Sequence, residues 1–149
     1  LSHVMSSGAT AIYRRCRWED NKATDVPTTI NEGMGGGLFL NANNASITLS
    51  GCTFSNNTAP LNGAAMRILA TQTTATLTDV TAMANVGGEQ PINVDTANQS
   101  ITTVERLTCT NNLAKKGAGC MLWKCEDGST CTMQGSHLSK TAPNRTQPR

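Results

Sequence analysis

The sequence predicts an all-β protein, a parallel β-helix whose chain coils through about five rungs of roughly 28 residues each. Three observations lead to this prediction. A nine-residue pattern recurs without internal gaps, a glycine-rich run precedes several of its copies, and large apolar side chains are scarce. Of 149 residues, 38% are hydrophobic and only 3% are aromatic, whereas 22 are Thr, 14 Asn, 16 Ala and 13 Gly. A narrow coil interior suits such small side chains, while an ordinary globular core depends on large ones.

The nine-residue pattern begins at positions that differ by 36, 28, 27 and 29 residues. Its copies cover residues 13–21, 49–57, 77–85, 104–112 and 133–141. The sixth position of each copy is expected to point into the core: Trp18, Phe54, Ala82, Cys109 and Leu138. The first position, which holds Tyr13 in the first copy, is expected to do the same at Leu49, Leu77, Val104 and Met133. Positions four and six alternate with polar residues, as in a strand, while the three-residue step from position one to four predicts a bend or bulge.

The last position of the pattern is asparagine in four copies and Thr141 in the fifth. We expect these asparagines to form a ladder at one corner of the coil: Asn21, Asn57, Asn85 and Asn112. Asparagine tolerates the left-handed backbone conformation of a corner, and its amide can bond to the same residue of the next rung. The glycine-rich runs that begin at Gly35, Gly63 and Gly117 predict a tight corner feeding a new strand.

A single unit cannot bury its apolar positions, so we expect the units to stack at the ~4.8 Å spacing of paired strands. An antiparallel sandwich also has strands every ~8–12 residues, but nothing in it restores the same asparagine and apolar positions every ~28 residues. We assign residues 1–142 to the repeat, as a segment of a longer solenoid, and residues 143–149 to a disordered tail. A loop is predicted between Ala23 and Gly33. A short helix over residues 114–126 is disfavoured by Gly117 and Gly119.

Two short motifs resemble those of a known family. Residues 54–57 (Phe-Ser-Asn-Asn) and 35–38 (Gly-Gly-Gly-Leu) are similar to the F-x-x-N and G-G-A-[ILV] motifs of polymorphic membrane proteins, autotransporter adhesins with a β-helical passenger. More broadly, residues 10–142 resemble right-handed parallel β-helix repeat proteins of the pectin-lyase-like superfamily. This resemblance, with the usual hand of parallel crossovers, implies a right-handed coil.

The charge is near balance, at a formal net +2, which speaks against a strongly basic nucleic-acid module. No apolar run reaches the ~18 residues of a membrane span, so we expect no membrane insertion in this segment. Six cysteines favour an extracellular or cell-surface location. So do Asn-X-Ser/Thr triplets, which begin at Asn44, Asn56, Asn98 and Asn144.

Two pairs of cysteines carry different predictions. Cys125 and Cys131 flank a turn-rich stretch and are expected to form a disulfide if the compartment is oxidising, the alternative being that both are free. Cys16 and Cys52 share one position of neighbouring rungs and are expected to remain thiols that pack as small apolar groups. No cysteine or histidine spacing matches a zinc site, and we expect neither a metal nor a cofactor.

Stacking brings one group of charges together, formed by Asp79, Glu105 and Arg106. A solvated ion pair is one interpretation of it, and a catalytic or calcium-binding role is the other. The remaining carboxylates scatter over the pattern. Threonines in the position before four of the five copies form an outward row that includes Thr48, Thr76 and Thr103, and this row is a second candidate for surface binding.

We therefore expect a non-enzymatic scaffold at the cell surface or outside the cell, which binds a protein or a glycan through its side faces in the manner of an adhesin. The alternative is a fragment of a carbohydrate-active enzyme, a polysaccharide lyase or glycoside hydrolase. Its catalytic residues would then lie on chain not present here or at Asp79, Glu105 and Arg106. A cluster of carboxylates on one face would favour the enzyme.

Overall fold

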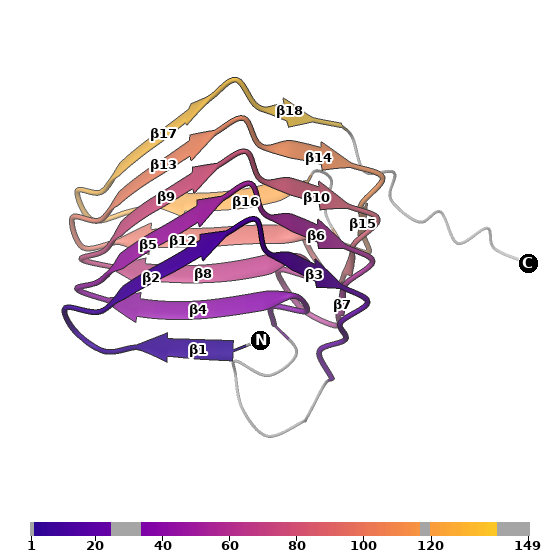
Figure 1. Ribbon diagram of the computed structural model, residues 1–149, viewed down its shortest axis with the longest axis horizontal. Coiled ribbons are helices and arrows are strands. Elements are labelled where there is room, and N and C mark those ends of the chain that lie inside the picture. The colour runs from indigo at the N-terminus through magenta and orange to yellow at the C-terminus, as the bar shows by residue number, and fades with distance from the viewer. Residues whose placement is uncertain (1, 25–33, 117–119, 140–149) are drawn as a thin grey trace, which may run out of the picture.

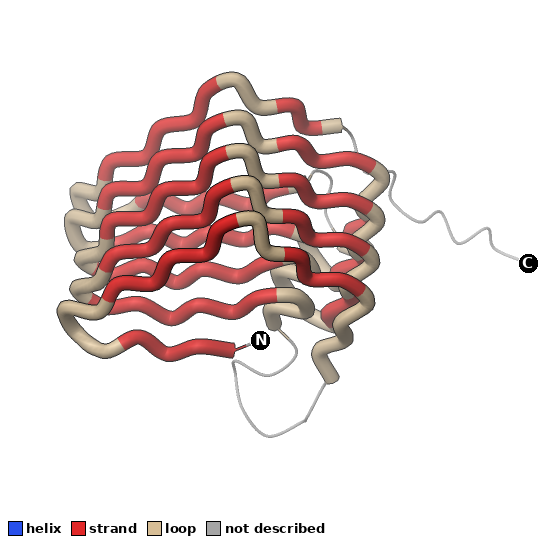
Figure 2. Tube along the Cα trace, in the orientation of Figure 1, coloured by secondary structure: helices blue, strands red, loops and turns tan. Residues whose placement is uncertain are grey.

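The computed structural model describes residues 2–24, 34–116 and 120–139, which form a parallel β-solenoid of about four turns (Figure 1). These residues are strands and loops, with no helix among them (Figure 2). The prediction of an all-β parallel β-helix is confirmed. The predicted loop at residues 25–33, the tail at residues 143–149, Gly117, Gly119 and Thr141 lie outside the described residues.

The described strands form four sheets, each built from segments that occupy the same place in successive rungs. The first sheet contains β1 (Ser2–Met5), β4 (Leu38–Asn43), β8 (Met66–Thr71), β12 (Ile92–Ala97) and β16 (Met121–Cys125). The second contains β2 (Thr10–Arg14), β5 (Ser46–Ser50), β9 (Thr74–Thr78), β13 (Ile101–Glu105) and β17 (Thr130–Gln134). The third contains β3 (Arg17–Glu19), β6 (Thr53–Ser55), β10 (Thr81–Met83), β14 (Thr108–Thr110) and β18 (His137–Leu138). The fourth contains β7 (Thr58–Ala59), β11 (Val86–Gly87) and β15 (Leu113–Ala114).

The chain passes through the four sheets in order and returns to the first sheet one strand further along the stack (Figure 1). Followed in this direction, the coil is right-handed. The five copies of the pattern give about four turns rather than five full rungs. The reason lies in the end rungs: the fourth sheet has three strands, while the other three sheets have five.

The sixth-position residues lie directly opposite one another in the third sheet. Trp18 pairs with Phe54, Phe54 with Ala82, Ala82 with Cys109, and Cys109 with Leu138. The rings of Trp18 and Phe54 stack with centroids 4.6 Å apart and planes 3° apart. The first-position residues pair in the same way across the second sheet. A side chain on one rung therefore packs on its own counterpart in the next.

Burial follows position in the stack rather than position in the pattern. Phe54, Ala82 and Cys109 are fully buried, as are most first-position residues of the middle rungs. Leu138 is 44% exposed and Met133 is 38% exposed, so neither is the buried core residue that the pattern predicts. Met133 lies on β17 and Leu138 on β18, and each of these strands has a neighbouring strand on one side only. Trp18, on the first strand of the third sheet, is partly buried for the same reason.

Left-handed backbone conformation occurs at the predicted glycine corners, at Gly35 and Gly63, but at the ladder corner it does not fall on the asparagines themselves. Between the third and fourth sheets, φ is positive at Asp20, Asn56, Ala84 and Asn111. Each of these residues precedes a ladder asparagine. The left-handed residue makes the corner, and the asparagine after it is thereby directed into the interior. The expectation that the ladder asparagines themselves adopt positive φ is wrong.

Candidate functional site

The outer face of the second sheet brings together all the residues that the sequence proposes for surface binding. Thr48 lies opposite Thr76, and Thr76 opposite Thr103, on β5, β9 and β13. All three are half-buried and alternate with buried residues of their strands, so they lie on the outer side of the sheet. The row continues to Thr132 on β17, whose hydroxyl donates to Thr103 Oγ1 at 3.4 Å.

The charged residues lie along one edge of this face. Glu105 ends β13 on the same side as Thr103, since the two are two residues apart in a strand. Asp79 and Arg106 follow β9 and β13 at the bend toward the third sheet, with φ of 53° and 52°. The two bends superpose from rung to rung, so the backbone N–H of Asp79 donates to the carbonyl of Glu105 at 3.0 Å.

Arg106 holds Asp79 with a bidentate contact. Its Nε donates to Oδ1 at 2.6 Å and its Nη2 donates to Oδ2 at 2.9 Å. Arg106 Nη1 also lies 3.6 Å from Glu105 Oε2, and the Gln134 amide donates to Glu105 Oε1 at 2.9 Å. Both side chains of the main pair are about half exposed, at 55% for Arg106 and 53% for Asp79. The contact is a solvated ion pair, which such exposure makes weak as a source of stability.

Asp79 and Arg106 shift each other's pKa values in the direction that favours their charged forms. The hydrogen bonds from Arg106 lower the pKa of the Asp79 carboxyl, and those to Asp79 raise the pKa of the Arg106 guanidinium. Asp79 therefore remains an anion near neutral pH, with both oxygens engaged. In this state it is a poor proton donor, and the guanidinium beside it disfavours a cation. Across residues 2–24, 34–116 and 120–139, no three His, Cys, Asp or Glu side chains come together as metal ligands.

The asparagine ladder lies inside the coil. Asn21 Nδ2 donates to Asn57 Oδ1 at 2.9 Å, Asn57 Nδ2 to Asn85 Oδ1 at 3.0 Å, and Asn85 Nδ2 to Asn112 Oδ1 at 2.9 Å. Each acceptor oxygen also receives a backbone N–H of the preceding rung, as in the 3.0 Å bond from Asn57 N to Asn85 Oδ1. The remaining amide proton is used as well, since Asn85 Nδ2 donates to Phe54 O at 3.0 Å. Asn57, Asn85 and Asn112 are buried, whereas Asn21 on the first rung is partly exposed, so the ladder is a structural element of the interior.

Two disulfides lie in the described part of the chain. Cys125 and Cys131, the expected pair, are joined across the turn between β16 and β17 with their Cα atoms 6.3 Å apart. Cys109 and Cys120 form the second, which the sequence does not indicate. It lies in the core beside the last ladder residue, because Asn112 Nδ2 is 3.1 Å from Cys109 Sγ. Cys16 and Cys52 are free thiols.

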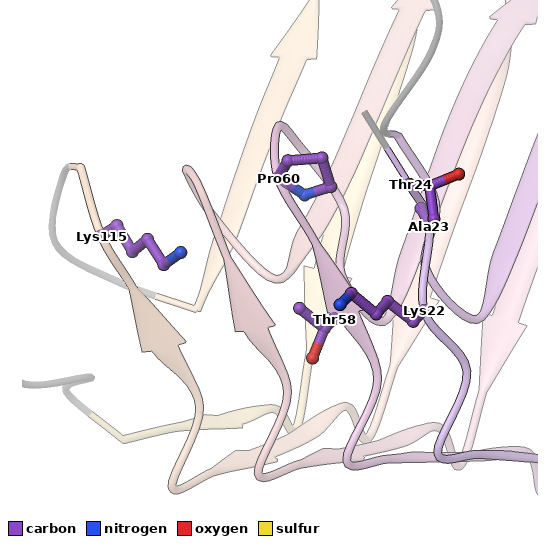
Figure 3. A pocket seen from close by; sticks show the side chains of 6 residues that line it. All are labelled: Lys22, Ala23, Thr24, Thr58, Pro60 and Lys115. Carbon is purple, nitrogen blue, oxygen red and sulfur yellow. The ribbon is translucent and has the colours of Figure 1, made fainter. Parts of the chain in front are cut away.

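A shallow groove of about 400 Å³ follows the short fourth sheet. It is lined by Lys22, Ala23, Thr24, Thr58, Pro60 and Lys115. Lys22 and Lys115 extend toward the groove from opposite sides of Thr58 (Figure 3). Neither lysine forms an ion pair with another described residue. The sequence pattern does not reveal this groove, because the two lysines come from rungs that are not adjacent.

A buried polar cluster lies on the first sheet. Arg67 on β8 donates through Nη2 to Asp95 Oδ2 on β12 at 2.7 Å, and its side chain is only 9% exposed. Asn93, 1% exposed, has no hydrogen-bond partner among the described residues at either end of its amide. Within the described part of the chain, Arg67 Nε and Asp95 Oδ1 have no partner either. Such atoms suit a hydroxyl or water that both donates and accepts. The sequence signal was an arginine at a strand position where the rung before has Phe39.

The comparisons with protein-family models, curated proteins and solved structures found no match to this chain. The likeness to polymorphic membrane proteins and to the pectin-lyase-like superfamily stays a prediction from short motifs. Within the described residues, no helix has the length and apolar character needed to cross a membrane.

Proposed function

We propose that the chain is a non-enzymatic scaffold, outside the cell or on its surface, that binds a protein or glycan through the outer face of the second sheet. The observation that carries this proposal is the juxtaposition on one face of the in-register threonine row and the network of Asp79, Glu105 and Arg106. Regularly spaced hydroxyl and methyl groups beside a charged edge offer both hydrogen bonds and apolar contact to a partner. The two disulfides support an oxidising compartment.

The state of the charged network favours the scaffold over a polysaccharide-cleaving enzyme. Acid–base cleavage of a glycoside needs a carboxylic acid whose pKa is raised, near a second carboxylate that is free to act. Here Arg106 lowers the pKa of Asp79, and Glu105 already accepts from Gln134. Both carboxylates are thus already engaged with neighbouring side chains.

Binding to glycan arrays and to cell surfaces tests the proposal. Thr76→Lys places a long charged side chain in the middle of the threonine row, and we expect it to weaken binding at least about tenfold. The matched control is Thr81→Lys, at a half-buried threonine of β10 on the neighbouring sheet. We expect this variant to bind like the parent chain. Equal losses in both variants, or no loss in either, would reject the threonine face as the binding surface.

Two further assays separate this proposal from its competitors. Double substitution of Lys22→Ala and Lys115→Ala removes the charge of the groove; if only this variant loses binding, the partner lies on the fourth sheet instead. A screen for polysaccharide lyase and hydrolase activity, with and without calcium, tests the enzyme. Turnover that disappears in Asp79→Ala or Arg106→Ala would replace the scaffold with an enzyme.

A further inference from the structure

The two free cysteines occupy one position of neighbouring rungs. Arg14 pairs with Ser50 before the bend and Arg17 pairs with Thr53 after it, so the residues between are also matched, and Cys16 lies opposite Cys52. Backbone hydrogen bonds hold this match on both sides: Arg15 N donates to Ser50 O at 2.8 Å, and Thr53 N to Cys16 O at 2.9 Å. Neighbouring parallel strands lie about 4.8 Å apart, within the ~4.4–6.8 Å that separates the Cα atoms of disulfides.

The thiol of Cys52 points toward the rung that carries Cys16. Its Sγ donates to the carbonyl of Tyr13 at 3.4 Å, an atom of the preceding rung. Cys52 is fully buried, whereas Cys16 is partly exposed and its Sγ donates to Arg14 O at 3.5 Å. Burial raises the pKa of the Cys52 thiol, and the adjacent Cys16 thiol contributes to the same shift. Cys16 is therefore the sulfur that a reagent in solution reaches first.

The same position on the next two rungs holds Val80 and Leu107, both buried in the core. Packing alone is thus satisfied by an ordinary aliphatic residue at this place. Two adjacent cysteines add something that valine and leucine lack, which is the capacity to form a covalent bond between rungs.

We propose that Cys16 and Cys52 are a redox-modification site, which closes to a disulfide between the first two rungs when the chain meets a small-molecule disulfide such as oxidised glutathione. The Cys16 thiolate attacks one sulfur of the oxidant, forming a mixed disulfide and releasing one thiol. The Cys52 thiolate then attacks the Cys16 sulfur and releases the second thiol. The protein loses two protons and two electrons, and the oxidant is reduced to two thiols.

The bond would act on the start of the described stack. The first rung contacts the rest through strand pairing on one side only, at β4, β5 and β6. A covalent bond from Cys16 to Cys52 closes 36 residues of chain and limits how far the first rung separates on partial unfolding. Oxidation therefore stabilises the first rung, and reduction loosens it.

The full chain, first treated with a mild reductant and then with oxidised glutathione, provides the test. Alkylation of the unfolded protein followed by non-reducing peptide mapping should recover Cys16 and Cys52 in one cross-linked peptide, with a mass lower by two hydrogen atoms. Urea unfolding followed by tryptophan fluorescence, in a Trp123→Phe background that leaves Trp18 as the one fluorophore of this kind, should have a higher midpoint after oxidation, and a reductant should reverse the shift. Trp18 stacks on Phe54 of the next rung, so its signal follows the separation of these rungs.

Two variants make the readout specific. Cys52→Val introduces the residue type that the next rung has at the equivalent position, where Val80 is buried. Cys16→Ser changes a partly exposed residue. We expect both to fold and to show no oxidation-dependent shift of the midpoint. The proposal is wrong if both thiols of the parent chain remain open to alkylation after oxidation. It is equally wrong if Cys16 keeps a glutathione adduct, or if either cysteine pairs with one of the other four.

Discussion

Two rows of cross-rung contacts run along the same stack, one inside the coil and one outside. The asparagine ladder joins side-chain amides at 2.9–3.0 Å, and the Asp79–Arg106 pair joins charges at 2.6–2.9 Å. The distances are alike, but Asn57 and Asn85 are fully buried, while Asp79 and Arg106 are about half exposed. An inner contact that breaks leaves polar atoms without water, whereas an outer one is replaced by solvent. The inner row therefore contributes more to the stability of the fold than the outer row.

The largest effect should come from the apolar part of the interior. Phe54→Ala removes a fully buried ring stacked on Trp18, and we expect it to lower the free energy of unfolding by about 3–5 kcal/mol. Leu138→Ala is the matched control, because it lies in the same column but is 44% exposed on β18. We expect a loss below about 1 kcal/mol there. Urea unfolding of both variants measures the difference. Similar losses would mean that the sixth-position residues are equally buried on every rung.

The ladder should come next. Asn85→Ala deprives Asn112 Oδ1 of one donor and leaves the backbone N–H and amide of Asn57 without their acceptor. We expect a loss of about 3 kcal/mol, since each buried polar group left unpaired costs about 1–3 kcal/mol. Asn111→Ala is a suitable comparison, because Asn111 is exposed and alanine already occupies the equivalent position one rung earlier, at Ala84. Two rungs earlier the equivalent residue is Asn56. A ladder variant no less stable than Asn111→Ala would contradict the assigned role of the inner row.

The outer pair should contribute little. Asp79→Ala and Arg106→Ala each remove an exposed, bidentate contact, and we expect thermal unfolding midpoints close to that of the parent chain. The double variant should match the single ones. A large drop in either midpoint would show that the outer row is as important to the fold as the inner row.

The smallest effect is a dependence on pH. Arg106 lowers the pKa of Asp79 in the folded chain, so the pair contributes its stability at pH values above the unfolded pKa of the carboxyl. That contribution is lost as the pH falls through the lowered folded pKa. Asp79→Asn should remove this acid-dependent component and leave the rest of the pH profile unchanged. If the stability of Asp79→Asn depended on pH in the same way as that of the parent chain, the ion pair would not persist in solution.

The sequence predicted which residues stack on one another from rung to rung. Stacking repeats a local pattern, and the spacing of that pattern is visible in the sequence alone. The same spacing brought Asp79 and Arg106 together. It could not report that Leu138 is exposed, since exposure depends on which strands follow. The Cys109–Cys120 disulfide and the Arg67–Asp95 pair were missed as well. Each involves residues outside the nine-residue pattern, Cys120 in one case and Arg67 and Asp95 on strands of the first sheet in the other, and the residues there differ from rung to rung.

Side-chain hydrogen exchange followed by NMR tests the contrast between the two rows most directly. The Nδ2 protons of Asn85 are buried and bonded to Asn112 and Phe54. Gln134 lies on the exposed strand β17, and its Nε2 group donates to Glu105. We predict that the Asn85 protons exchange only when the stack opens, far more slowly than those of Gln134, which should exchange near the rate of a free amide. Equally fast exchange at both sites would contradict a solvent-excluded ladder inside the coil.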